Sequence, residues 1–528
     1  MIGRSLTVFD MPEFGYPNAE PWTRSIGRTE LFDPSYVPIV IIDADTQVFV
    51  DAKSTTFRSM TFILKENVFS FGEVRSSTKN TDEDKFQFKV DLPDGGIYHR
   101  DELKFRPSAY DPVFFRQILY GDIAHAIGNP AHESVAVRVY LSDGTGIGLY
   151  VLQEDCTTES FIRTAFFGNP DGTIKDYTPN VIYDCATGAD FTANDGKYLG
   201  SFKNNTEDLK IELLAMTQKL EALDVNDVDA VKDFDDNDLD LDTLLRALAL
   251  EYLTGHWDSY WGLTTNFVTY HPDGDEGNYK FYFIDQDFDQ TWGGGMYEGL
   301  DPQNYPRKPY TQLIGINWKE LNQNPDDTET RVLVDRFLGC DGQPSCTTKE
   351  LFENHLKSIV QHIFNPVAMK RKTDGYKKRL YEEMQWDLGL PRLHTGSVQQ
   401  YHFTMNDFEF GIDTAQYEGS LFFWGILDWT TAICNTVCQQ FGIDYDKIAL
   451  TPETAAKEEV KPIDPGTPPL DTGTSSSTTS TTGGNLKLNL DDESLDSGNR
   501  TVAIQTLQNI IVTVFFSISL SILLFIIN

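Results

Sequence analysis

The sequence predicts an α+β fold in which a strand-rich N-terminal half precedes a helical C-terminal half, with a disordered stalk and a hydrophobic tail behind them. Alternating segments rich in β-branched and aromatic residues concentrate in the first part of the chain. Segments with apolar residues three and four apart dominate the later part. With 40% hydrophobic and 12% aromatic residues among 528, the chain can bury a large core.

Individual elements follow from local signals. Asp111 as N-cap, Pro112 at the first helical position and Gly128 as C-cap predict a helix over 111–128. A turn at Asp143-Gly144 separates two of the predicted strands. The predicted strands cover 37–43, 49–53, 60–71, 85–92, 134–141 and 148–155, and the later helices cover 207–223, 243–257, 350–364 and 421–442.

Two segments resemble known ligand-binding loops, a dinucleotide-binding loop and an EF-hand calcium loop, but each lacks a feature that its loop requires. The glycine-rich run 144–148 leads into a strand, whereas a dinucleotide-binding loop must lead into a helix. Residues 224–242 contain nine aspartates, yet Asp238 stands where an EF-hand loop requires glycine and Leu244 where it requires glutamate. We therefore expect a solvated linker there, with Asp242 capping the next helix.

The formal net charge of −37 excludes a nucleic-acid-binding protein, because the phosphate backbone would be repelled. The six cysteines form no zinc-binding pattern, and disulfides are the better interpretation if the chain is exported. Cys340 and Cys346 flank a turn and could pair locally. A bond between Cys434 and Cys438, one helical turn apart, would be strained, so their partners stay open.

The C-terminal segment 501–528 resembles a signal for a glycosylphosphatidylinositol (GPI) anchor. Residues 510–527 carry no charge, and no basic residue follows them as it would after a spanning helix. Small residues and a mostly polar spacer precede the apolar run, and Ser497 is the expected attachment residue, with Gly498 and Asn499 as alternatives. A tail-anchored membrane helix is the other interpretation. Residues 446–500 form the predicted stalk, rich in Pro, Ser and Thr.

The remaining chain divides into an N-terminal extension, 1–20, and one folded domain, 21–445. The extension has no apolar segment typical of a secretory signal, which conflicts with an anchor signal at the other end. We expect the natural start to lie upstream, as in an incomplete gene model. Asn204 begins a glycosylation sequon.

Three aspartates follow an aromatic strand pattern in FIDQDFDQTWGGG, residues 283–295. In an extended segment Asp285, Asp287 and Asp289 would share one face, where their charges repel unless a cation lies between them. A divalent metal fits this requirement, and a solvated hairpin end is the alternative.

Further motifs precede the aspartates in the order used by protein kinases. His256-Trp257-Asp258 is followed by Asn266 and then by Asp287-Phe288-Asp289. Protein kinases use His-Arg-Asp, an Asn and Asp-Phe-Gly to position the hydroxyl and bind magnesium. This order favours a two-lobed, atypical protein-kinase-like fold with a strand-rich N-lobe and a helical C-lobe.

The stretches EYLTGHWDSYWGLTTNFVTY (251–270) and KFYFIDQDFDQTWGGG (280–295) resemble the CotH family, in particular its fungal cell-surface branch. Bacterial members are spore-coat kinases that use ATP and a divalent metal. Fungal relatives include GPI-anchored invasins that adhere to host cells through a heat-shock chaperone. The loop that binds the receptor in that branch differs here, so the receptor's identity is not implied.

The resemblance implies roles for single residues. Asp258 matches the catalytic aspartate, and Asn266, Asp287 and Asp289 match positions that bind Mg²⁺ or Mn²⁺. The nucleotide-binding positions correspond to Lys85, Lys104 and Arg116, and the family's phosphate loop corresponds to residues 71–80.

Two functions are implied, and they are compatible. The first is ATP- and metal-dependent phosphoryl transfer to Ser or Thr hydroxyls of a protein substrate. The second is a GPI-anchored surface adhesin or invasin that binds a host-cell receptor, with catalysis secondary or lost. A structural protein of the cell wall is a third interpretation. All three place the protein in the secretory pathway and at the cell surface.

Overall fold

The structure is a computed structural model that describes residues 5–17, 22–193, 199–204, 210–272, 280–398, 401–414 and 424–457. The chain divides into two units, Met1–Gly466 and Thr467–Asn528, and every described residue belongs to the first. The described residues form both helices and strands, in agreement with the predicted α+β class. The apolar run 510–527, Ser497 and most of the predicted stalk lie outside the described residues. Within the described ranges, the search for a helix with the length and hydropathy of a membrane span finds none.

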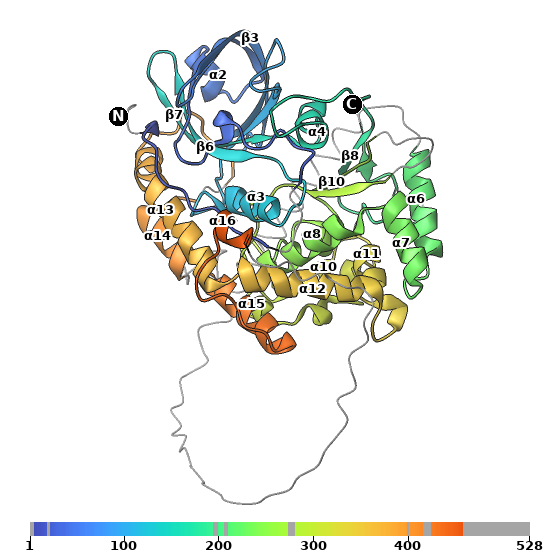
Figure 1. Cartoon of the computed structure of the whole chain (residues 1–528). Coiled ribbons are helices and arrows are strands. Elements are labelled where there is room, and N and C mark those ends of the chain that lie inside the picture. Colours follow the sequence, from blue (N-terminus) through green and yellow to red (C-terminus); the bar gives the residue numbers. More distant parts are fainter. Residues whose placement is uncertain are drawn as a thin grey trace, which may run out of the picture. The chain divides into compact units, whose positions relative to one another are not determined.

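Seven strands of the N-terminal half close into a barrel, drawn in blue and cyan in Figure 1. Around the barrel the order is β1-β2-β3-β4-β5-β7-β6, and only the closing pair, β1 with β6, is parallel. The strands are β1 (Ile39–Asp43), β2 (Thr55–Ile63), β3 (Val68–Lys79), β4 (Gln87–Asp91), β5 (Glu102–Arg106), β6 (Ser134–Leu141) and β7 (Gly146–Glu154).

Alternation along β4 and β5 decides which side chains fill the barrel. Phe88 and Phe105 are opposite one another across the two strands and stack at 4.5 Å between ring centroids in the barrel core. Because successive side chains of a strand point to opposite faces, Lys89, Lys104 and Arg106 lie on the outer face. These basic residues belong to the candidate site.

Three predictions for this half are wrong. Residues 46–50 form the short helix α2 (Thr46–Val50), capped by the Asp45 side chain, where a strand over 49–53 was expected. Residues 60–71 are two strands joined by a turn. Residues 71–80, the expected phosphate loop, lie almost entirely in β3, where the Ser76 and Thr78 hydroxyls donate to carbonyls of Thr55 and Ala52.

A second, smaller sheet has the order β11-β10-β8-β9. Its strands are β8 (Ile182–Cys185), β9 (Phe202–Lys203), β10 (Phe267–Tyr270) and β11 (Tyr282–Asp285). The antiparallel pairing of β10 with β11 forms a hairpin, and residues 273–279, between the two strands, lie outside the described residues. The hairpin therefore brings Asn266 and Asp287, at its two ends, to the same edge of this sheet.

Besides α2, the described chain contains the following α-helices (Figure 1). They are α3 (Arg116–Ala126), α4 (Glu159–Phe166), α6 (Ile211–Ala222), α7 (Val228–Asn237), α8 (Leu241–Thr254), α9 (Tyr260–Leu263), α10 (Trp318–Asn322), α11 (Val332–Phe337), α12 (Thr347–His362), α13 (Pro366–Leu388), α14 (Met405–Asp413), α15 (Ile426–Phe441) and α16 (Pro452–Ala455). Every residue of α8 except Asp242 is buried, because α8 packs against α12 and β11. Because α8 is buried on all sides, the segment that follows it, from Gly255 on, has a fixed position.

The aspartate-rich segment 224–242 is not a linker. Most of it forms α7, whose apolar Val231 and Phe234 are buried three residues apart, while Asp229, Asp233 and Asp236 are exposed. The cap of α8 is Asp240, which accepts from the backbone N–H of Thr243, and not Asp242. Asp242 instead pairs with Arg246 and His355.

The helix predicted over 111–128 begins later, at Arg116. Asp111 accepts hydrogen bonds from the backbone N–H of Val113 and of Arg116, so its carboxylate organises the turn before the helix. Gly128 follows the helix with φ 80°, as expected of a residue that ends one.

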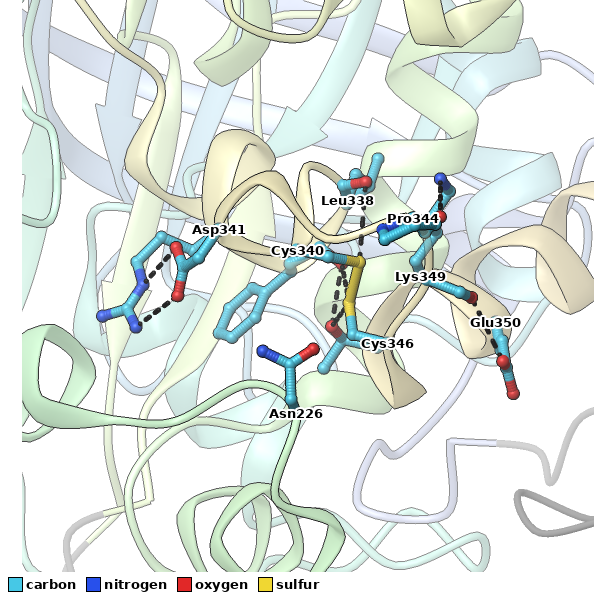
Figure 2. The surroundings of a disulfide bond; sticks show 12 residues. Asn226, Leu338, Cys340, Asp341, Pro344, Cys346, Lys349 and Glu350 are labelled. Carbon is cyan, nitrogen blue, oxygen red and sulfur yellow. Dashed lines mark hydrogen bonds and ion pairs between the residues drawn. A yellow bond between two sulfur atoms is a disulfide. The ribbon is translucent and has the colours of Figure 1, made fainter.

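The predicted local disulfide is present. Cys340 and Cys346 are bonded across the loop between α11 and α12 (Figure 2). Cys434 and Cys438 lie on α15 with their sulfur atoms 4.0 Å apart and are free thiols, in agreement with the strain expected for that pair. Cys156 and Cys185 are also free thiols.

Candidate active site at the barrel and the second sheet

The three motifs predicted to act together are joined by hydrogen bonds. Helix α8 ends at Thr254, Gly255 caps it with φ 59°, and the chain continues into His256 and Asp258. The His256 ring donates from Nε2 to the backbone carbonyl of Asp287, at 3.1 Å. The Asn266 amide donates to the backbone carbonyl of Asp258, at 2.8 Å. Residues that follow α8, precede β10 and follow β11 therefore meet at one place.

Asp285 does not share a face with Asp287 and Asp289, so that prediction is wrong. Asp287 has φ 62°, which breaks the extended conformation that the alternation requires. Asp285 is buried and accepts hydrogen bonds from the Tyr120 hydroxyl, at 2.6 Å, and the Ser259 hydroxyl, at 3.2 Å. Burial raises the pKa of Asp285 to about 6. Asp285 thus anchors the end of β11 through these two hydrogen bonds. We name the other three carboxylates, those of Asp258, Asp287 and Asp289, the aspartate cluster.

A cation from the barrel lies between two members of the aspartate cluster. One guanidinium nitrogen of Arg106, Nη2, lies 2.5 Å from Oδ1 of Asp287 and 2.9 Å from Oδ2 of Asp289. The Arg106 and Asp289 side chains are each 11% exposed, and Asp287 is 35% exposed. The two carboxylates therefore converge on one cationic group at a partly open position.

The electrostatics of the aspartate cluster follow from burial and from Arg106. Burial raises the pKa of Asp258 well above its usual range, and the charges of Asp287 and Asp289 add to this effect. Burial also acts to raise the pKa of Asp287, but the adjacent Arg106 outweighs it and holds that pKa well below the usual range. At Asp289 burial prevails over Arg106 and raises the pKa to about 7. The cluster thus prefers a state with fewer than three negative charges.

Lys104 lies on the same face of β5 as Arg106, two residues earlier. Its ammonium is 3.5 Å from Oδ1 of buried Asp155, and its charge helps to lower the pKa of Asp287. Lys89, directly opposite Lys104 on β4, also pairs with Asp155. Lys104 therefore lies on the face of the barrel that carries Arg106, and its contact with a nucleotide stays a prediction.

Lys85 and Arg116 lie in other buried ion pairs. Lys85 donates to the backbone carbonyl of Leu149 and lies 3.1 Å from Oδ1 of Asp387 on α13. It lines a cavity of about 270 Å³ together with Asp387 and residues of the loop after β5. Arg116 is fully buried and pairs with Asp111, whose charge contributes to the raised pKa of Asp289. Arg116 is thus linked to the aspartate cluster only through Asp111, which pairs with Arg116 and whose charge acts on Asp289.

Sequence reasoning missed Arg106, Asp155 and Lys89 as members of this site. Arg106 stands two residues after Lys104 in the pattern LKFR, so the alternation of β5 was a usable signal. The pairing of Arg106 with residues more than 180 positions later had no local signal.

The residues present fit a divalent metal in the manner typical of magnesium. Within the described ranges no group of three or more His, Cys, Asp or Glu side chains is arranged to enclose a metal ion. Magnesium is usually bound through one or two carboxylates, with the remaining ligands from water and substrate phosphates. Two carboxylate oxygens that already converge on one cationic nitrogen satisfy that requirement.

Of the two predicted modification sites, one lies within the described residues. Asn204 follows β9 and is half-buried. Ser497 lies outside the described residues.

The chain is similar to known proteins over most of its length. A family model described as CotH kinase protein matches residues 73–402. Invasin CotH2 of the fungus Rhizopus delemar is 28% identical over 462 residues, which is 83% of this chain and 73% of that protein. Invasin CotH3 of the same fungus is 27% identical over 474 residues, covering 86% of this chain and 74% of that protein. Spore coat protein homolog 1, also from this fungus, is 26% identical over 432 residues, covering 78% and 65%.

Proposed function

The chain belongs to the CotH family, and from this premise we propose that it catalyses ATP- and metal-dependent phosphoryl transfer to Ser or Thr hydroxyls of a protein at the cell surface. The observation that carries the proposal is the convergence of Asp287 and Asp289 on one cationic position beside Asp258. We also propose that the barrel and the helical part act as the two lobes of a kinase-like fold. The order of elements supports this, because β5, with its basic residues, directly precedes helix α3, as the lysine-bearing strand of a protein kinase precedes its first helix.

In this proposal Asp258 accepts the proton of the attacking hydroxyl. Burial raises the pKa of Asp258, which makes its carboxylate a stronger base than that of an exposed aspartate. Its position is fixed because Asn266 donates to its backbone carbonyl and Gln290 donates to its side chain at 3.4 Å.

Asp287, Asp289 and the Asn266 side chain would hold Mg²⁺ or Mn²⁺. When bound, the cation would offset negative charge on the transferred phosphoryl group. His256 holds the Asp287 backbone in its unusual conformation, so the direction of the Asp287 carboxylate is set before any ligand arrives.

Lys104 is the strongest candidate for a phosphate contact from the barrel, because it is close enough to the aspartate cluster for its charge to lower the pKa of Asp287. Lys85 and Arg116 stay predictions as nucleotide ligands. Each would have to leave a buried ion pair, with Asp387 and with Asp111 respectively, and leaving an unpaired charge buried is costly.

The test is a calorimetric titration of the purified chain with ATP and Mg²⁺ or Mn²⁺, beside a phosphotransfer assay. We expect the parent to bind the nucleotide only when metal is present, and Asp287→Asn to lose both binding and transfer. Asp236→Asn, on the exposed face of α7, removes the same charge elsewhere and serves as the matched control. A parent without metal-dependent binding, or an Asp287→Asn chain as active as the parent, contradicts the proposal.

A second function, adhesion to host cells, is favoured by the names of the relatives, two of which are called invasins. In this function the chain would be displayed through a GPI anchor at Ser497 and would bind a host-cell receptor. Cells that lack the protein should then adhere less to endothelium or epithelium, and a phosphatidylinositol-specific phospholipase should release the protein from cells. Equal adherence by cells with and without the protein contradicts this second function.

A further inference from the structure

Arg106 occupies the position between the two carboxylates that the proposed function assigns to the metal. Its Nη2 atom lies 2.5 Å from Asp287 Oδ1 and 2.9 Å from Asp289 Oδ2. Within the described residues its guanidinium has no ion-pair or hydrogen-bond partner besides these two aspartates. The Arg106 side chain is 11% exposed, so a largely buried charge of the protein itself offsets one of the two carboxylate charges.

A metal ion and Arg106 cannot hold the same oxygens at once. Both are cations, and at such distances in a partly buried site their repulsion is weakly screened. A free metal ion therefore has to compete with a guanidinium that is tethered to the last residue of a barrel strand.

A nucleotide changes this competition because it brings anionic phosphates. A guanidinium matches phosphate oxygens in charge and in its planar, forked geometry. Arg106 can then exchange two carboxylates for a phosphate, and it leaves Asp287 and Asp289 to the metal that arrives with the nucleotide.

We propose that Arg106 is a positioning residue that fills the metal position in the ligand-free chain and transfers to the nucleotide phosphates when a metal–nucleotide complex binds. This inference rests on the proposed function, since it assigns a role at the same site. It makes the chain take up metal together with nucleotide and bind metal alone poorly.

The experiment measures two affinities in each purified chain. Binding of Mn²⁺ alone is followed by the electron paramagnetic resonance signal of free Mn²⁺, and binding of Mn²⁺ with ATP by calorimetry. We expect Arg106→Gln to bind Mn²⁺ alone at least about tenfold more tightly than the parent, and Mn²⁺ with ATP at least about tenfold more weakly, since close charge pairs have coupling energies of this size or larger. A role in folding alone would not move the two affinities in opposite directions.

Two further variants separate charge from packing. Arg106→Met keeps the aliphatic stem and removes the charge, and we expect it to behave as Arg106→Gln does. Arg75→Gln removes one positive charge from the exposed face of β3, where Arg75 is 78% exposed, and we expect both affinities to equal those of the parent. Thermal melting of all chains identifies any variant that fails to fold. If one of Arg106→Gln and Arg106→Met fails, the affinities of the other test the inference.

The outcomes distinguish this inference from the proposed function. If the neutral variants gain no affinity for Mn²⁺ alone, the inference is overturned, even where the parent transfers phosphate. If they gain that affinity while the parent neither binds Mn²⁺ with ATP nor transfers phosphate, Arg106 does fill a metal position and the kinase proposal is wrong.

Discussion

Lys89 and Lys104 lie directly opposite each other on β4 and β5, and both pair with the same carboxylate, that of Asp155. Like charges in directly opposed positions of a sheet destabilise it. One buried carboxylate offsets only one of the two ammonium charges. Arg106, two residues after Lys104 on the same face of β5, adds a further positive charge beside the aspartate cluster.

Replacing Asp155 should leave the two lysines opposed without compensation. We expect Asp155→Asn to lower the free energy of unfolding by about 3 kcal/mol, as when one partner of a buried ion pair is removed. Urea denaturation measures this change. Asp91→Asn, at a 43% exposed position of β4, should cost less than about 0.5 kcal/mol. Equal stability of the Asp155 variant and the parent would show that the lysines are hydrated and not held by Asp155.

Removing the proposed base should affect turnover more than binding. We expect Asp258→Asn to lower kcat about 10²- to 10⁴-fold, while its affinity for the metal–nucleotide complex changes little, because positioned proton transfer contributes about this factor. Steady-state kinetics and calorimetry on the same preparation separate the two quantities. A variant with an unchanged kcat would remove Asp258 from the catalytic role.

Metal binding should weaken as the pH falls. Burial raises the pKa of Asp289 to about 7, so near neutrality a proton competes with the metal for this carboxylate. We expect the affinity for Mn²⁺ with ATP to increase from about pH 6 to about pH 8, with release of a proton on binding. Calorimetry in two buffers with different ionisation enthalpies counts this proton. In Asp289→Asn the dependence should flatten, and a parent with the same affinity at both pH values contradicts the assignment.

The stacked pair in the barrel core should carry much of the barrel's stability. We expect Phe105→Ala to lower the free energy of unfolding by about 3 to 5 kcal/mol, through the lost apolar burial and the cavity it leaves against Phe88. Val68→Ala, at a 63% exposed position of β3, is the control and should cost less than about 0.5 kcal/mol. A small loss for Phe105→Ala would mean that the barrel repacks around the gap.

The family resemblance read from the motifs is confirmed, and much of the site follows from local sequence. His256, Asp258, Asn266 and Asp287 could be predicted together because turns and a hairpin connect them over short distances along the chain.

The errors have identifiable physical causes. Asp285 was assigned to the wrong face because a single residue, Asp287, adopts a positive φ that no composition signal marks. The helix α7 was missed because its aspartates suggest hydration, although Val231 and Phe234 carry the spacing of a buried helical face. Arg106 was missed because its partners, Asp287 and Asp289, lie more than 180 residues later in the chain, and only tertiary structure brings them together.

The parallel pairing of β1 with β6 determines where a recombinant fragment of this protein can begin. The family match begins at residue 73, within β3, so it omits β1 and β2, which complete the ring of strands. A recombinant fragment trimmed to the matched span would carry two unprotected sheet margins, and such margins recruit neighbouring molecules. Expression of the domain therefore requires the chain from Ile39 onward, even though residues 39–72 lie outside the span by which the family is recognised.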